Sequence, residues 1–580
     1  MRKFFTRSIQ TMSRKLSDLP VSSTFTENLT PDPVVPTVDA LKHASDEMLH
    51  MPRKVNDGAL FTYMTPSMKA ESKLLAYSPS CMKSLGLDES EAETDAFQKL
   101  VVGKDIDVDK CCPWSQCYGG FQFGDWAGQL GDGRVVSLCE LTNPDTKERY
   151  EIQVKGVGRT PYSRFADGMA VVRSSIREHL CCEALHALNV PTTRSLAIST
   201  LDGVAAMRET VEPCAIVCRM APSWIRIGTF DLPGVNGNLE SIRKLADYCL
   251  DHVLTKDFQG RGVGNRYEQL LRDVAFRNAK SVAKWQVYGF MNGVLNTDNT
   301  SILGLSMDFG PFSFMDTYNP SFTPNHDDVF LRYSYQRQPS IIIWNLAKLA
   351  SALLEFIGAK GQVDDPQFME KLHNSPELIS EAHEYTLQVF ENIAKEFLSI
   401  VREDYFQLMT ARLGLPDDAT ARKQVIDALD ILENYDLDYP NFFSFLTRVK
   451  VEEGDNSSSA ERLFDLCVSS FNKNNPRFRN EAIGKFEGWL DAYHQLCAEI
   501  PEVTRLNTMK SVNPHFTLRN WVLEEVNKKA YEGDFDLFHK VAKMTASPFE
   551  DSWGFSKDFE DTYCYSTGPT KSQIQCSCSS

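Results

Sequence analysis

Short apolar runs separated by glycine-containing turns fill much of the first half of the chain, a pattern typical of β-strands. The runs at 135–141 and 150–154 are joined by a polar Asn-Pro-Asp-Thr turn, which predicts one pair of strands. A second pair is expected at 195–198 and 215–220. Between the two pairs, residues 169–188 repeat apolar side chains on one helical face and therefore predict a helix.

Helical spacing of apolar residues dominates from about residue 240 onward. A long helix is expected at 270–290, and another begins near Pro339. The remainder is almost wholly helical in pattern, with loops expected at 453–459 and 547–553. A β-rich part followed by a helical part predicts an α+β enzyme with two lobes.

Composition sets the two ends of the chain apart from its middle. Residues 19–45 are rich in Pro, Thr and Ser, which predicts a linker. We therefore divide the chain into six expected segments. They are a presequence at 1–18, an N-terminal linker and extension at 19–110, a first lobe at 111–235, a second lobe at 236–410, a helical extension at 411–570 and a cysteine-containing tail at 571–580.

The start of the chain is basic, contains Ser and Thr, and has no acidic residue before Asp18. An acid-poor, amphipathic start is typical of a mitochondrial presequence, and the apolar run is too short for a secretory signal. A short disordered basic tail is the alternative. We favour mitochondrial import, with the matrix as the expected compartment. The basic residues are Arg2, Lys3, Arg7, Arg14 and Lys15.

Bulk composition narrows the class of protein. Of the 580 residues, 42% are hydrophobic and 24% are charged, as in globular proteins with a sizeable core. Polar residues interrupt the most apolar stretch, 341–358, so no transmembrane segment is expected. The net charge of −17 argues against a general nucleic-acid binder, although a local basic pocket for phosphates stays allowed. Most of the fifteen cysteines are expected to be buried thiols, whereas Cys576 and Cys578 follow a polar stretch and are candidate redox residues.

Three features in the first half suggest a nucleotide site. Gly131 and Gly133 lie in a glycine-rich turn followed by Arg134, and such turns let backbone N–H groups approach phosphate oxygens. Lys155 ends an apolar strand, and Glu178 follows it by 23 residues on the predicted helix, where its carboxylate could pair with the lysine. Taken singly, these are equally a hairpin turn, a solvated lysine and a surface glutamate.

Two further residues complete the pattern of a protein kinase. Asn299 and Asp308, the latter in an Asp-Phe-Gly sequence, supply the oxygen ligands that Mg²⁺ prefers. Their order after Lys155 predicts a site for Mg-ATP. A kinase has its base five residues before the asparagine, and here that position is Val294, while Asp298 lies directly beside Asn299. The chain is therefore either an inactive scaffold or an enzyme of a different nucleotide transfer.

Long stretches of the chain closely resemble the selenoprotein O (SelO, YdiU) family. The likeness begins with Tyr118–Arg134 and extends over residues from about 50 to 580. It includes Lys155–Arg164, Arg173–Glu178, Asn296–Thr300 and Leu518–Trp521. The resemblance implies a protein-kinase-like fold that binds ATP turned around and adenylylates proteins on Ser, Thr or Tyr, releasing pyrophosphate. The family shares the departure at the base position.

The resemblance also implies the roles of individual residues. Arg219 and Arg226 hold the far phosphates, where guanidinium groups stabilise the charge of a pyrophosphate leaving group. Asn299 and Asp308 bind Mg²⁺ or Mn²⁺, and Asp298 accepts the proton of the substrate hydroxyl. The residues expected to contact the nucleotide are Gly131, Gly133, Arg134, Lys155, Asp167 and Gly168, with Glu178 orienting the lysine.

The tail and the substrates complete the expectations. Some family members carry selenocysteine near the end of the tail, where this chain has Cys578. A disulfide between Cys576 and Cys578 would be strained, so a partner elsewhere in the chain is favoured. Bacterial relatives have a cysteine where this chain has Thr323-Pro324, which argues against a tail disulfide to that position. The expected partners are protein substrates, such as mitochondrial redox or metabolic proteins. An atypical kinase and a nucleotide-binding pseudokinase scaffold remain as alternatives.

Overall fold

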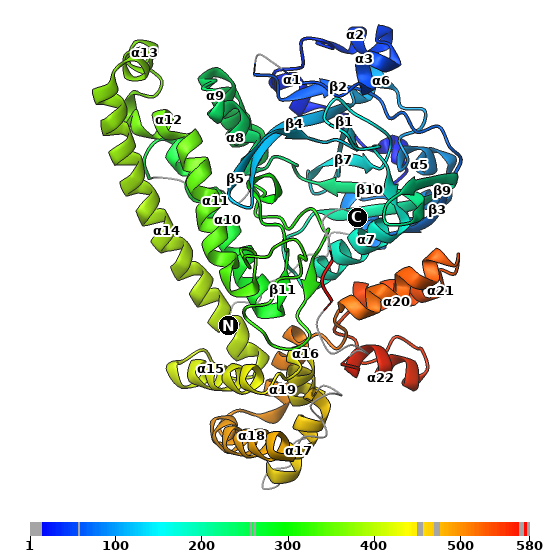
Figure 1. Cartoon of the computed structure of the whole chain (residues 1–580), viewed down its shortest axis with the longest axis vertical. Helices are drawn as coiled ribbons and strands as arrows, with labels where there is room; N and C mark the ends of the chain where they lie inside the picture. Colours follow the sequence, from blue (N-terminus) through cyan, green and yellow to red (C-terminus); the bar gives the residue numbers. More distant parts are fainter. Residues whose placement is uncertain are drawn as a thin grey trace.

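The chain is an α+β protein with a large antiparallel sheet and a mainly helical C-terminal part. Figure 1 shows the strands gathered in one region and the long helices in another, with α14 running along one side. Within the described residues, no helix has the length and apolar character needed to cross a membrane. The computed structural model describes residues 14–55, 58–255, 258, 263–448, 456–468, 476–567 and 574–576.

The ten-stranded sheet has the order β2-β4-β6-β7-β10-β9-β3, with β1, β5 and β8 paired to β6, β4 and β10. Its registered pairs are antiparallel. The strands are β1 (Val21–Ser22), β2 (Phe61–Tyr63), β3 (Ser72–Tyr77), β4 (Trp114–Gln122), β5 (Asp125–Gly131), β6 (Val135–Thr142), β7 (Arg149–Lys155), β8 (Ala170–Val171), β9 (Arg194–Met207) and β10 (Val211–Ala221). Both predicted strand pairs are present, as β6 with β7 and β9 with β10.

The helix predicted at 169–188 is α7 (Val172–Ala187), and it is the main support of the sheet. It packs against β9 and β10 on one side and against α20 (Asn520–Tyr531) and α21 (Asp536–Ala546) on the other (Figure 1). Because both sides of α7 are covered, nearly all of its side chains are buried, including the carboxylate of Glu178. The helix is therefore held rigidly between the sheet and the C-terminal part.

The helical region is built around the pair α10 (Arg266–Tyr288) and α14 (Pro376–Arg412). The helix predicted near Pro339 is divided at Leu353 into α11 (Gln338–Ala352) and α12 (Leu354–Gly358). A small second sheet, β11 (Phe290–Met291) with β12 (Ser313–Phe314), flanks the turn that carries Asn299 and Asp308. The neighbouring elements are α8 (Ile227–Val235), α9 (Leu239–Tyr248), α13 (Pro366–Asn374) and the 3₁₀ turn η4 (Thr297–Asn299).

The first part of the helical extension predicted at 411–570, up to Met509, packs around the rings of Phe442, Phe486 and Trp489, in an apolar cluster shared with residues 287–335. The buried apolar residues at 516–564 belong to the main core instead. The loop expected at 547–553 is present. At 453–459 the prediction is wrong in part, because a helix begins at Asn456, and residues 453–455 lie outside the described residues. The helices are α15 (Ala419–Asn434), α16 (Tyr439–Arg448), α17 (Asn456–Cys467), α18 (Pro476–Cys497), α19 (Glu502–Val512), α20, α21 and α22 (Lys557–Tyr565).

The N-terminal segment differs from the expected linker at 19–45, because it packs onto the sheet. Phe25 and Val35 are fully buried, and the ring of Phe25 stacks on Trp114 with centroids 5.6 Å apart. Its apolar residues are isolated among Pro, Thr and Ser, so the sequence shows no periodicity from which their burial could be predicted. The helices between residues 14 and 113 are α1 (Thr24–Asn28), α2 (Val38–His43), α3 (Asp46–His50), α4 (Pro79–Leu85), α5 (Asp95–Leu100) and α6 (Val108–Cys111).

The expected presequence boundary at residue 18 also differs from the structure. Arg14 forms an ion pair with Asp145 at 2.6 Å, and the backbone N–H of Leu16 donates to Glu91. Residues 14–18 thus belong to the folded part of the chain. Three of the five basic residues noted in the presequence, Arg2, Lys3 and Arg7, lie outside the described residues.

Candidate active site

A cavity of about 280 Å³ lies between the sheet and the helical region. It collects side chains from β7, α7, the η4 turn and the Asp-Phe-Gly sequence, which are far apart along the chain. Val294, in the position of a kinase base, also lines it. Five residues singled out from the sequence line this cavity: Arg134, Lys155, Glu178, Asn299 and Asp308.

Lys155 and Glu178 form the ion pair that their spacing predicted. The Nζ of Lys155 donates to Oε2 of Glu178 at 2.6 Å, and Arg219 donates to Oε1 of the same carboxylate at 3.1 Å. Burial by itself would raise the pKa of Glu178, but the charges of Lys155 and Arg219 lower it to about 2. Burial lowers the pKa of Lys155, and Glu178 opposes that effect. The carboxylate therefore stays ionised and fixes the position of two cations.

Two buried arginines, Arg219 and Arg226, lie beside Asp308, although neither lines the cavity itself. Arg226 donates to Oδ2 of Asp308 at 3.1 Å and to the backbone oxygen of Asp298 at 2.9 Å, while Arg219 lies 3.7 Å from Oδ1 of Asp308. Each guanidinium rests on an aromatic face, Arg219 on Trp224 and Arg226 on Tyr118, at 4.4 and 4.3 Å from the ring centroids. Both side chains are at most 3% exposed, and they share the carboxylates of Glu178 and Asp308 as ion-pair partners.

Asn299 and Asp308 fit a divalent cation that is held partly by phosphate oxygens. The Nδ2 of Asn299 donates to the backbone oxygen of Val294 at 3.0 Å, which turns its Oδ1 away from that carbonyl. The second oxygen ligand would come from the carboxylate of Asp308, which lines the same cavity. Among the described residues, no group of three or more His, Cys, Asp or Glu side chains could hold a metal ion by itself. This donor set suits Mg²⁺, which keeps water and takes nucleotide phosphates as ligands.

Asp298 is buried beneath the tip of the β4–β5 hairpin and is only 6% exposed. A Cβ added to Gly120 would lie 2.4 Å from Oδ1 of Asp298, so only glycine permits the strand to pass this closely. The amide of Gln122 donates to Oδ2 at 3.0 Å, whereas Oδ1 has no hydrogen-bond partner among the described residues. Burial raises the pKa of Asp298 to about 6, against the lowering effects of Gln122 and Arg226.

The sequence did not single out the residues that hold this hairpin tip. The backbone N–H of Phe121 donates to Oγ1 of Thr297 at 2.8 Å, and that of Phe123 donates to the hydroxyl of Tyr333 at 2.8 Å. Together with Gln122 they fasten the strand to the turn that contains Asp298. The sequence indicated the run Tyr118–Arg134 only as a family motif. Because side chains alternate along a strand, the pair Phe121 and Gln122 could have indicated that the strand contacts a different part of the protein on each face.

Six of the eight residues expected to bind ATP do not line the cavity: Gly131, Gly133, Asp167, Gly168, Arg219 and Arg226. The expected base Asp298 does not line it either. The first two glycines pack against Tyr162, since an added Cβ would lie within 3 Å of that residue. Gly168 has a φ of +79° and abuts the backbone of Gly158. Asp167 pairs with Arg208 at 2.7 Å. These residues shape the strands behind Arg134, whose guanidinium donates to the backbone oxygen of Met169.

The described part of the tail lies along the segment after the Asp-Phe-Gly sequence. The N–H of Cys576 donates to the backbone oxygen of Pro324 at 2.9 Å, and the N–H of His326 donates to that of Cys576 at 3.0 Å. Within the described residues the cysteines, Cys576 included, are free thiols. Cys578 lies outside the described residues. The chain position of Thr323-Pro324 is therefore next to the tail cysteine in space.

An ion-paired strand lysine and two oxygen-bearing side chains line one cavity, and two buried arginines lie beside it. This is the arrangement that the sequence predicted for an enzyme acting on a nucleotide. A family model described as "Protein adenylyltransferase SelO" matches residues 46–546. The chain belongs to this family, whose description makes it an enzyme of the nucleotidyltransferase class.

Individual relatives agree with the family. The chain is 67% identical over 569 residues to "Protein adenylyltransferase SelO, mitochondrial" of Schizosaccharomyces pombe, which covers 98% of this chain and 100% of the relative. It is 33% identical to the Saccharomyces cerevisiae protein of the same name, over 87% and 88% of the two chains. It is 37% identical to "Protein nucleotidyltransferase YdiU" of Ralstonia nicotianae, over 84% and 88%. The names of the two fungal relatives support the mitochondrial location expected from the sequence.

Proposed function

We propose that the cavity binds Mg-ATP with its phosphates inward and that the enzyme transfers AMP to Ser, Thr or Tyr hydroxyls of proteins, releasing pyrophosphate. The observation that carries this proposal is the pair of buried guanidinium groups, Arg219 and Arg226, directly beside Asp308 in the cavity wall. An adenine ring favours an apolar slot, whereas the surroundings of Asp308 offer charge and hydrogen-bond donors for phosphate oxygens. With the far phosphates held there, the α-phosphate faces the acceptor.

The order of Lys155, Glu178, Asn299 and Asp308 along the chain, which is that of the corresponding residues of protein kinases, supports this proposal. In our proposal the sheet with α7 is one lobe, at 111–235, and α8 to α14 form the other, at 236–410. Lys155 on β7 and Glu178 on α7 then correspond to the lysine and glutamate that bind phosphates in kinases. The helical extension at 411–570 covers the outer side of α7 through α20 and α21.

Asn299 and Asp308 would hold Mg²⁺ or Mn²⁺, which neutralises phosphate charge when bound. Asp308 is then shared between the cation and Arg226, whose guanidinium remains free to donate to a phosphate oxygen through its other N–H groups. Lys155 and Arg134 donate to the nucleotide from the opposite wall. Gly131, Gly133, Asp167 and Gly168 act on the nucleotide by fixing the backbone around Arg134.

Asp298 is proposed as the acceptor of the proton from the substrate hydroxyl. The hydroxyl oxygen forms a bond to the α-phosphorus, its proton passes to Asp298, and the bond from the α-phosphorus to the bridging oxygen breaks, so that pyrophosphate leaves. Gln122 occupies Oδ2 of Asp298, and Gly120 covers the carboxylate. The hairpin tip must therefore lift before a protein hydroxyl reaches this base.

The cell biology of the enzyme is proposed on the same basis. The matrix is the proposed compartment, and redox or metabolic proteins of the mitochondrion are the proposed substrates. Cys578 is proposed to stand where other family members carry selenocysteine. Cys576 and Cys578 stay candidates for redox control.

A label-transfer experiment tests the proposed reaction. The purified protein receives Mg-ATP labelled at the α-phosphate or at the γ-phosphate, together with proteins of a mitochondrial extract. We expect label from the α position to be retained in acceptor proteins. Retention from the γ position alone would identify a kinase, and retention from neither would identify a scaffold.

Replacing the proposed metal ligand provides a sharper check. Asp308→Ala removes the only carboxylate ligand proposed, so we expect α-label transfer to fall at least about a hundredfold. The protein should stay folded because Arg219 keeps its partner Glu178. Undiminished transfer by this folded variant would refute the assignment of the metal site.

A further inference from the structure

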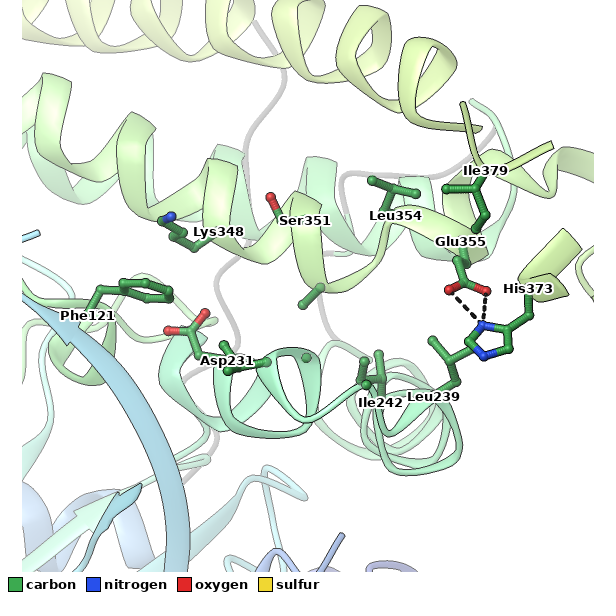
Figure 2. A pocket seen from close by; sticks show the side chains of 14 residues that line it. Phe121, Asp231, Leu239, Ile242, Lys348, Ser351, Leu354, Glu355, His373 and Ile379 are labelled. Carbon is green, nitrogen blue, oxygen red and sulfur yellow. Dashed lines mark hydrogen bonds and ion pairs between the residues drawn. The ribbon is translucent and has the colours of Figure 1, made fainter. Parts of the chain in front are cut away.

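Figure 2 shows a second cavity, of about 330 Å³, which Phe121 of the hairpin tip lines, whereas Gln122 and Phe123 line the candidate nucleotide site. It runs between α8 and α9 on one side and α11 and α12 on the other. Its walls are apolar and come from Leu239, Ile242, Leu354 and Ile379. Val235, at its rim, is 53% exposed, which leaves an apolar surface open to a partner. We refer to this cavity as the acceptor groove.

The two ends of the groove carry charge. Glu355 and His373 lie at one end, with Nδ1 of the histidine 3.1 Å from the carboxylate (Figure 2). Asp231, Lys348 and Phe121 lie at the other end, and the ammonium of Lys348 is 4.2 Å from the centre of the Phe121 ring. An occupant of this groove must therefore match apolar walls and an acid at each end.

Asp231 is the most unusual of these residues. It is only 3% exposed, and its Oδ2 has no hydrogen-bond partner in the described part of the chain. The carboxylate is directed toward the space between Phe121 and Lys348 (Figure 2). A buried carboxylate oxygen without a donor is costly, and the cost is recovered when a ligand supplies the donor. The groove is thus built to receive a hydrogen-bond donor or a cation at this end.

The same end of the groove is joined to the catalytic turn. Thr297 lies close enough to Asp231 to lower the pKa that burial raises, and the Thr297 hydroxyl accepts a hydrogen bond from the N–H of Phe121. Thr297 directly precedes Asp298. Phe121 lines the groove, while Gln122, next along the strand, points to the opposite side and contacts Asp298. Anything that moves Phe121 therefore moves the strand that covers Asp298.

We propose that the acceptor groove docks an extended segment of the protein substrate, with an apolar side chain between α9 and Ile379 and a basic side chain on Asp231. The apolar walls, the unpartnered acid and the continuity with the catalytic turn together favour this occupant. Contact of the segment with Phe121 shifts the hairpin tip and uncovers Asp298 for the acceptor hydroxyl. This inference rests on the proposed transfer of AMP to proteins.

A charge placed at the rim tests the docking site. Val235→Glu puts a carboxylate on the apolar wall at an exposed position, and Ile426→Glu does the same at a matched position on α15, where Ile426 is 47% exposed. Both proteins receive α-labelled Mg-ATP and increasing amounts of mitochondrial extract. We expect labelling by Val235→Glu to be about tenfold weaker at low extract concentration and to recover at high concentration. Ile426→Glu should match the unmodified enzyme, and ATP affinity should be equal in all three.

Synthetic peptides distinguish docking from a general loss of activity. Peptides with one Tyr and one Leu, flanked either by Arg or by Glu, are compared as acceptors. The unmodified enzyme should prefer the Arg peptide, and Asp231→Asn should lose that preference. If the unmodified enzyme transfers α-label while Val235→Glu equals it at every concentration, the docking site is overturned and the proposed function stands. If the unmodified enzyme transfers no α-label to any acceptor, both the docking site and the proposed function are refuted. Dimerisation abolished by Val235→Glu would assign the groove to a second copy instead.

Discussion

At the scale of single residues, the proposed role of Asp298 as the base predicts the pH range of the reaction. Its pKa is raised to about 6 by burial, and a general base works only when deprotonated. Below that pH the carboxylate carries a proton, so the transfer rate at saturating ATP should fall as the pH drops through about 6. The hydrogen bond from Gln122 to Oδ2 stabilises the charged form and holds the pKa down.

Gln122→Leu should therefore move the midpoint of the acid limb to higher pH. The variant removes a donor to the carboxylate, which favours the protonated form of Asp298. The measurement is the rate of α-label transfer between pH 5 and pH 8, at saturating ATP. Gln367→Leu, at an exposed position on α13, serves as the control and should leave the midpoint in place. A midpoint that stays or moves to lower pH in Gln122→Leu would contradict the assignment of Asp298.

The sequence predicted some of these residues and not others for a physical reason. Lys155 and Glu178 lie on a regular strand and a regular helix, so their spacing alone brings them to one point. Gln122 contacts Asp298 across 176 residues, and Asp231 is a single acid in an apolar helix. Such contacts depend on how distant elements pack, and no local periodicity reports them.

At the scale of elements, the tip of the β4–β5 hairpin covers Asp298, so in the proposed reaction it controls access to the base. Gly120→Ala should displace the strand or Asp298, because the new Cβ would lie 2.4 Å from Oδ1 and 2.8 Å from Cβ of Asp298. We expect α-label transfer to fall at least about tenfold while ATP affinity changes little, because Lys155 and the arginines are untouched.

Gly484→Ala, on α18, is the matched control for this substitution. An added Cβ there meets nothing within 4 Å, and alanine favours a helix. Equal transfer by Gly120→Ala and the unmodified enzyme would show that the hairpin tip lies elsewhere during the reaction.

The regular elements of the fold followed from periodicity, whereas the short ones did not. The pairs β6 with β7 and β9 with β10 alternate or bury continuous apolar runs, so the sequence marked them. The N-terminal segment, with helices of five and six residues, has too few positions to show a period. Its apolar residues are buried because they pack onto the sheet. The strands of that sheet lie elsewhere in the chain, so the sequence of the segment alone could not predict this burial.

At the scale of the whole molecule, a buried ion-pair network ties the C-terminal extension to the region of the active site. Arg519 is fully buried and lies 2.5 Å from Oδ2 of Asp438 and 3.2 Å from Asp316. Burial raises the pKa of Asp316 to about 6, and Arg519 opposes that effect. Arg177 on α7 donates to the backbone oxygen of Phe312 and, at 3.5 Å, to Asn520. The extension is therefore part of the same folded unit as the catalytic residues.

Arg519→Leu should destabilise the protein by about 3–5 kcal/mol, because it leaves two carboxylates buried without their cation. This loss is a decrease in the free energy of unfolding, which urea denaturation measures. Adding Asp438→Asn to this variant removes one of the two stranded charges and should restore part of the loss. Lys529→Leu, which breaks an exposed pair with Glu532, should cost less than about 1 kcal/mol. If Arg519→Leu costs no more than Lys529→Leu, the extension does not depend on this network, and its link to the catalytic region must come from apolar packing against α7.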